Sequence, residues 1–373
     1  MQLADLAAKD RQRPQGAGLP REPSRRAGAW PAIAIARRQR ICYRDYRIGR
    51  KQEMRMHKLL RSIGFLGALV LLSSCTKGPP AKVSFGYQPF GSNLPFFVAA
   101  EKGFFKQHNI EVEPVKIISA NDAANAVVQG SIVGNATVPL NVLLNIEENQ
   151  PGLMKIFMVK ATSKERWSDY LLVKKGSPIR SIADLKGKKV GGYPGSAQQI
   201  LIRLILRQFM DDKDILTVEM PPSTQLQGLD AGQIDALLTY DDLAITALEN
   251  GIAQVLEEDP ICKHVVNPMY AFPYVLSSKF VKDNPTAAKE IRDAMYQAAD
   301  FIKTNEPEAR QIMAKWVGTK KEIADKVNLW DQPKAEQIDR AALQKLADIF
   351  FDAGVTKKRI DTSHLYLTDG DLK

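Results

Sequence analysis

The sequence predicts an α/β fold made of two α/β units, with a helical part at its C-terminal end. From Val83 onward, short apolar segments alternate with longer amphipathic ones, a pattern typical of parallel strands connected by helices. Beyond Leu276 the apolar residues instead recur at every third or fourth position, as they do along helices that bury one face. These two patterns set the fold class and its order along the chain.

The first unit begins with a strand at residues 82–87, followed by a loop at 88–93. Pro95 then opens a helix, because proline lacks an N–H and fits the first helical turn. Further strands are expected at residues 110–115, 132–136, 154–160 and 170–174, with helices at 121–129 and 139–148.

A second unit begins near Ser181, where a capping-box pattern precedes a short helix. Asp241 stands where a later helix needs its N-cap. The unit is expected to contain strands at residues 189–192, 217–220 and 234–239, a return strand at 273–276, and helices at 182–187, 196–210, 224–231 and 241–250.

After the return strand the chain is predicted to be helical. Asn284 and Pro285 start a helix whose apolar residues follow a spacing of three and four. A second helix follows Asn305, and a third runs from Lys334 to Ala353. We interpret the Met and Trp residues of these helices as core side chains rather than as cofactor contacts.

The formal charge of +10 is concentrated at the N-terminal end. Residues 1–74 hold 16 of the 52 Lys and Arg residues but 5 of the 42 Asp and Glu residues, so the rest of the chain has a net charge of −1. A nearly neutral globular part lacks the basic surface that binding to nucleic acid requires. We therefore expect no nucleic-acid partner.

Residues 54–74 have the basic start, apolar run and small residues of a secretory signal peptide. The apolar run is about half of the roughly 20 residues that span a bilayer. The segment Leu-Ser-Ser-Cys75 is similar to the lipobox of bacterial lipoproteins, which implies that Cys75 is lipidated and becomes the first mature residue. Residues 75–81 would form a tether, anchored by two or more acyl chains. The alternative is an ordinary signal peptide that contains a cysteine.

Residues 1–53 are rich in Arg and Pro and show neither helical nor strand periodicity. A signal peptide is not normally preceded by so long a segment. We therefore expect translation to start at Met54 or Met56, with residues 1–53 as a non-native extension. A disordered basic arm is the alternative.

Cysteine and histidine residues indicate neither metal binding nor catalysis. Of the three cysteines, only Cys262 lies in the part expected to fold, which excludes an internal disulfide framework. The four histidines show no metal-ligand spacing with each other or with Cys262. We expect no metal, no cofactor and no catalytic residues.

Four segments resemble the solute-binding family that serves importers of nitrate, sulfonate, taurine, bicarbonate and thiamine precursors. They are residues 94–105 (LPFFVAAEKGFF), 125–138, 182–196 and 229–236. Their order and spacing carry the resemblance, which implies a type II periplasmic-binding-protein fold with a ligand between two lobes. Lobe I would comprise residues 82–172 plus 275–373, and lobe II residues 173–274.

The resemblance also implies a function in an ABC importer. The protein would capture a small molecule outside the cytoplasm and deliver it to a permease that works with an ATPase. The solute would be an anion such as sulfonate or nitrate, or a pyrimidine related to thiamine precursors. We expect a monomer, lipid-anchored to a membrane that faces the periplasm or the cell exterior.

Two other functions stay open. A lipoprotein sensor that binds a ligand would look the same in sequence. An enzyme of thiamine-pyrimidine synthesis on the same fold is disfavoured, because the cysteine cluster of those relatives is missing here.

Loops at the carboxyl ends of parallel strands, at a junction between domains, form the default ligand pocket. The candidate residues are Asn93, Asn121 and Thr137 in lobe I, Ser196, Tyr240 and Asp241 in lobe II, and Tyr274 on the return strand. Ser196 precedes a helix whose free N–H groups and positive dipole would suit an anion or a polar acceptor. A plain helix cap is the favoured interpretation of Ser196 taken alone, and Thr137, just ahead of Pro139, has the same ambiguity.

Tyr240 and Asp241 combine an aromatic face with a carboxylate, which suits a flat ligand with an amino group better than nitrate or sulfonate. Helix capping is again the alternative for Asp241. Tyr274 would be a second aromatic wall, and the loop at 163–167 would also face the ligand. Closure is expected as a hinge motion at crossover segments near Leu172 and Tyr274.

Overall fold

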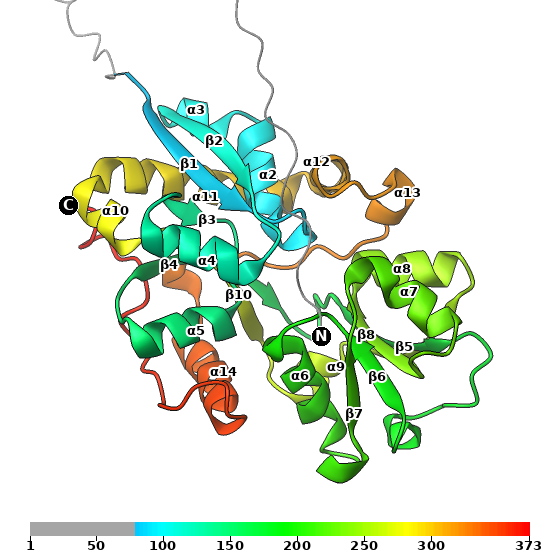
Figure 1. The fold of residues 1–373 in the computed structure, drawn as a ribbon. Helices are drawn as coiled ribbons and strands as arrows, with labels where there is room; N and C mark the ends of the chain where they lie inside the picture. Colours follow the sequence, from blue (N-terminus) through cyan, green and yellow to red (C-terminus); the bar gives the residue numbers. More distant parts are fainter. Residues whose placement is uncertain (1–78) are drawn as a thin grey trace, which may run out of the picture. The chain divides into compact units, whose positions relative to one another are not determined.

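The computed structural model describes residues 79–373, which contain two five-stranded mixed sheets (Figure 1). The first sheet has the order β2-β1-β3-β10-β4. Its strands are β1 (Ala81–Tyr87), β2 (Ile110–Lys116), β3 (Gly134–Asn135), β4 (Met154–Thr162) and β10 (Met269–Ser277). β1 pairs in parallel with β2 and β3, whereas β10 runs antiparallel between β3 and β4.

The second sheet has the order β7-β6-β8-β5-β9. Its strands are β5 (Asp169–Lys174), β6 (Lys189–Gly192), β7 (Leu216–Glu219), β8 (Ala236–Tyr240) and β9 (Ala253–Glu258). β6 is parallel to both β7 and β8, and β5 is antiparallel to β8 and β9. Each sheet therefore joins parallel βαβ strands to antiparallel strands, which confirms the predicted α/β class.

Helices cover both sheets and form most of the C-terminal part (Figure 1). Those of the first sheet and the C-terminal part are α2 (Leu94–Glu101), α3 (Phe104–Gln107), α4 (Ala120–Gln129), α5 (Leu140–Asn149), α10 (Ser278–Asp283), α11 (Pro285–Thr304), α12 (Glu306–Val317), α13 (Lys321–Ala324) and α14 (Arg340–Asp352). Those of the second sheet are α6 (Ser196–Leu206), α7 (Pro222–Asp230), α8 (Asp241–Glu249) and α9 (Pro260–His264). Short 3-10 helices lie at Gly91–Asn93, Ile182–Leu185, Asp212–Asp214 and Ala335–Gln337. Of the helices in residues 79–373, none combines the length and apolar character needed to cross a membrane.

The chain changes sheet at residues 163–168 and again at 259–268. The predicted boundaries at 172/173 and 274/275 instead fall inside β5 and β10, so each lies several residues too late. The sequence of an apolar strand does not indicate to which sheet the strand belongs. Its periodicity reflects burial and not the identity of the neighbouring strand. β9 was missed for a related reason. It is an edge strand with only one buried residue, and its polar positions hide the strand pattern.

The last predicted helix is interrupted near its start. Residues 335–337 form a 3-10 turn, and α14 begins at Arg340. The Asp339 side chain accepts hydrogen bonds from the N–H groups of Ala341 and Ala342, as an N-cap does. A carboxylate cap therefore restarts the helix inside a segment that its apolar spacing predicted to be continuous.

The largest buried apolar cluster contains residues of both sheets. It joins Val275 of β10 to Leu171 of β5 and Leu201 of α6. A second cluster lies between the first sheet and the C-terminal helices, where the Trp316 ring stacks on Phe97 with centroids 5.0 Å apart. The interpretation of Trp316 as a core contact is thus confirmed.

Gly134 on β3 lies in a tightly packed part of the first sheet. A Cβ at this position would lie 2.5 Å from the Val275 carbonyl oxygen and 2.7 Å from the Phe85 ring. We expect Gly134→Ala to lower the free energy of unfolding by about 1–3 kcal/mol, because the first obstacle is backbone. In Gly370→Ala the nearest atom is 3.4 Å away, so this control should change stability by less than about 0.5 kcal/mol. Urea titrations of the two variants measure the difference, and equal midpoints would contradict this packing.

Candidate functional site

A buried lysine stands among three aromatic rings where strands of both sheets meet. The Nζ atom of Lys160, on β4, lies 3.9 Å from the ring centroid of Trp330 and 5.5 Å from those of Tyr240 and Phe272. Tyr240 ends β8 of the second sheet, Phe272 is on β10 of the first, and Trp330 follows α13. We call these three rings the aromatic cage. Its geometry matches that of cation–π contacts.

Lys160 is almost fully enclosed, with 5% of its surface exposed. Its ammonium donates a hydrogen bond to the Ser168 hydroxyl at 2.8 Å. Burial lowers the pKa of Lys160 to about 8, although the nearby carboxyl groups of Asp241, Asp169 and Asp242 act in the opposite direction. This ammonium therefore loses much of its hydration and gains little direct pairing.

Asp241 is the first residue of α8 and is 3% exposed. Within the described chain neither of its carboxylate oxygens has a hydrogen-bond partner of good geometry, although the Tyr170 hydroxyl is close enough to lower its pKa. Burial dominates and raises the pKa of Asp241 well above its usual range. The capping interpretation of Asp241 is wrong, because Tyr240 occupies the N-cap position and the Asp241 side chain caps no helical N–H among the described residues.

A second buried carboxyl, Asp169, opens β5 beside Tyr240. It accepts a hydrogen bond from the Ile261 N–H at 3.0 Å. Burial raises the pKa of Asp169 to about 7, with the Ile261 N–H working against that rise and Asp259 adding to it. Two carboxyl groups, one lysine and three rings are thus enclosed together at the junction of the sheets.

Asn93 and Thr137, two of the predicted site residues, lie side by side and are hydrogen-bonded to each other. The Asn93 amide donates to the Thr137 hydroxyl at 3.0 Å and its oxygen accepts from the Gln88 N–H at 3.1 Å. Asn135 donates to the Thr137 carbonyl, and Gly86 makes room for it, since a Cβ there would lie 2.2 Å from its side-chain oxygen. In the described part, the oxygen of Asn135 and the side-chain nitrogen of Gln88 are buried without a partner.

Tyr274 is a correction to the predicted site. It is fully buried, its hydroxyl donates to the Ser92 carbonyl, and its ring packs 6.2 Å from that of Phe157. It is therefore a core residue rather than an aromatic wall. Phe272, two positions earlier on the same strand, is the β10 residue whose ring contacts Tyr240, with centroids 6.3 Å apart.

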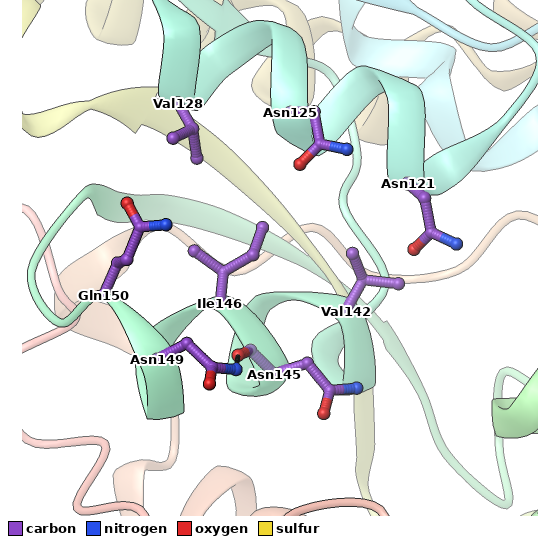
Figure 2. A pocket seen from close by; sticks show the side chains of 8 residues that line it. All are labelled: Asn121, Asn125, Val128, Val142, Asn145, Ile146, Asn149 and Gln150. Carbon is purple, nitrogen blue, oxygen red and sulfur yellow. Dashed lines mark hydrogen bonds between the residues drawn. The ribbon is translucent and has the colours of Figure 1, made fainter.

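Asn121 is exposed in the first turn of α4. It lines a surface hollow of about 260 Å³ between α4 and α5, where the two helices face each other (Figure 2). The other lining residues are Asn125, Val128, Val142, Asn145, Ile146, Asn149 and Gln150. The aromatic cage contributes no residue to this hollow, so the hollow and the cage are separate places.

The remaining predicted positions are only partly described. Ser196 begins α6 after Gly195, whose φ of +105° favours glycine. In the loop at 163–167, Trp167 is partly buried against Tyr170 and Leu172. Residues 1–78, including Cys75 and the signal segment, lie outside the described residues. Among residues 79–373 there is no group of His, Cys, Asp and Glu suited to hold a metal ion.

The folded part matches a known family over most of its length. Residues 76–318 match the NMT1-like family. The chain belongs to this family. A protein of Brucella abortus (strain 2308) that is named as a candidate binding protein is 25% identical over 309 residues, which cover 78% of this chain and 91% of the relative.

Solved structures show the same fold for this NMT1-like chain. The periplasmic aliphatic sulphonate binding protein SsuA of Escherichia coli has a TM-score of 0.64 at 18% identity, covering 78% of this chain and 92% of SsuA. The predicted periplasmic-binding-protein fold is thereby confirmed. The 4-amino-5-hydroxymethyl-2-methylpyrimidine phosphate synthase of Saccharomyces cerevisiae (strain ATCC 204508 / S288c) is 21% identical over 233 residues, 59% of this chain and 67% of the yeast protein. The relatives thus include an enzyme as well as binding proteins.

Asp169 makes stability depend on pH in a defined direction. Its pKa is about 7 when folded, against 3.8 without burial, so the stability it contributes is present below pH 3.8 and is lost as pH rises to about 7. We expect Asp169→Asn, which keeps an oxygen for the Ile261 N–H, to gain stability relative to the unaltered protein over this window. The gain is at most about 4 kcal/mol, since one pKa unit is about 1.4 kcal/mol. Thermal unfolding at pH 4 and pH 7 measures it, and a difference that does not change with pH would contradict the burial of this carboxyl.

Proposed function

We propose that this protein is the extracytoplasmic solute-binding component of an ABC importer, which closes two lobes around a small molecule. The observation that carries the proposal is the aromatic cage with Asp241, because its parts come from both sheets. A site assembled from two lobes is complete only when they are together. A solute that contacts both sides therefore has a higher affinity for the closed state and can drive closure.

The two stretches where the chain changes sheet, 163–168 and 259–268, are the natural hinges for such a motion. Opening would separate contacts between the lobes. The Lys326 ammonium pairs with Glu249 at the end of α8 at 2.6 Å, and Ile245 of α8 packs in the same apolar cluster as Leu329. The second contact is next to the cage in sequence, since Leu329 immediately precedes Trp330.

The delivery part of the proposal rests on the leader and on the family. A lipidated Cys75 would hold the protein at a membrane, facing the periplasm or the cell exterior, where a permease and its ATPase would accept the solute. The periplasmic sulphonate-binding protein with the same fold supports this location. We propose a monomer and a solute that is either a small anion or a pyrimidine of the thiamine-precursor kind.

A catalytic role is the second candidate, because one relative is named as a pyrimidine phosphate synthase. The two functions differ in what the protein retains and releases. Mass spectrometry of solute freed from the purified, denatured protein tests this directly. A binding protein should release one unmodified compound and produce no new compound when incubated with it.

Removing a ring from either side of the cage should weaken binding of the solute identified in this way. We expect Tyr240→Ala on the second sheet and Phe272→Ala on the first each to weaken affinity about 5- to 150-fold, as loss of a stacked ring costs roughly 1–3 kcal/mol. Titration calorimetry measures the affinity, and small-angle scattering with and without solute measures closure.

Asn125→Ala is the matched control, because Asn125 lines the surface hollow between α4 and α5 and contributes nothing to the cage. Its affinity and its change in radius of gyration should equal those of the unaltered protein. An unaltered protein whose radius of gyration stays constant at saturation would contradict the clamp mechanism.

Cys75→Ser should abolish lipidation and leave the protein unprocessed or released from the membrane, because the thiol is the group that takes the lipid. Metabolic labelling with palmitate and membrane fractionation give the readout. Cys262→Ser is the control, since that buried cysteine lies in the folded part and should not affect labelling. Equal labelling of the Cys75→Ser variant and the unaltered protein would refute lipidation at this residue.

A further inference from the structure

The aromatic cage already holds a cation in this structure. The Lys160 ammonium lies over the Trp330 ring at 3.9 Å and faces Tyr240 and Phe272 at 5.5 Å. Ring faces carry partial negative charge and attract ammonium groups, more strongly when water is excluded. Lys160 and Trp330 are each at most 5% exposed, so the interaction takes place away from solvent.

The charged groups around the cage are predominantly acidic. Lys160 faces the carboxyl groups of Asp241, Asp169 and Asp242, and burial raises the pKa of all three. An anion that entered here would add negative charge where buried carboxylates are already destabilised. A cation would relieve that repulsion.

Among the described residues Asp241 also lacks a well-placed donor, although the Tyr170 hydroxyl is near it. Both of its oxygens are buried without a well-formed hydrogen bond within residues 79–373, a costly arrangement for a carboxylate. Lys160 does not fill this role, because no ion pair joins the two side chains within 4.0 Å in the described structure, and its one hydrogen bond goes to Ser168. A solute N–H group would complete the partnership.

We infer that the solute carries an amino or ammonium group, which donates to the Asp241 carboxylate and competes with the Lys160 ammonium for the aromatic cage. This inference rests on the proposed solute-binding function. In this inference Asp241 and the cage recognise the solute, and Lys160 acts as an internal competitor for the cage. This assignment also separates this chain from a receptor for simple sulfonates, whose anionic group would need Lys160.

Two probes that share a benzyl group and carry opposite charges test the inference, benzylammonium and phenylmethanesulfonate. Calorimetry with the purified chain in detergent at neutral pH should give a Kd for benzylammonium at least about tenfold lower. Lys160→Met keeps an unbranched side chain one heavy atom shorter and removes its charge, so it should tighten benzylammonium binding about tenfold. Asp241→Asn should weaken it by a similar factor, because the variant loses the carboxylate charge.

The two variants shift affinity in opposite directions, so loss of folding does not imitate the expected result. Asn125→Ala, in the surface hollow between α4 and α5, is the control that should leave both affinities unchanged. Tighter binding of phenylmethanesulfonate, weakened by Lys160→Met, would overturn the inference and leave solute binding intact. The inference also fails if neither probe binds at about 10 mM while the protein retains a co-purified solute. If no solute is retained and neither probe binds, the proposed function fails as well.

Discussion

The structure depends on the enclosure of one ammonium, that of Lys160, among rings and carboxyl groups drawn from both sheets. A charge removed from water must be compensated by its surroundings. Here the compensation comes from Trp330, Tyr240 and Phe272 and from nearby aspartates rather than from one close ion pair. Since these residues belong to different sheets, the electrostatic environment of Lys160 exists only while the two sheets stay together. The geometry of the candidate site therefore depends on the relative position of the lobes.

The fold could largely be predicted from local patterns. The alternation of apolar and amphipathic segments gave the two sheets, and the Ser181 capping box and the start of α11 at Pro285 are present as expected. The point at which the chain passes from one sheet to the other could not be predicted. Residues 170–174 form an apolar segment that would fit a strand of either sheet. The choice was made by pairing with β8 and β9, which is a long-range property.

The sequence indicated only some of the residues of the candidate site. Tyr240 and Asp241 were predicted as site residues because they stand at the end of a predicted strand, and both lie near Lys160. Tyr274 was the residue predicted on β10, whereas the β10 ring that contacts Tyr240 is that of Phe272, two positions earlier. Lys160 carried a signal that was overlooked, since a lone charged residue near the end of an apolar strand needs a special environment. Trp330 carried none, because it stands in an irregular segment after α13, far along the chain from the residues it contacts.

The pair between Lys326 and Glu249 has a consequence for the resting state. Both side chains are about half exposed, at 51% and 49%, so their attraction is weakened by water and by mobile ions. An exposed pair of this kind contributes about 0–1 kcal/mol. It biases the lobes toward each other without locking them. The apolar clusters that join the two sheets contribute the larger share of this contact. In the proposed clamp, a rise in the ionic strength of the surroundings would therefore shift the balance only slightly toward the open form.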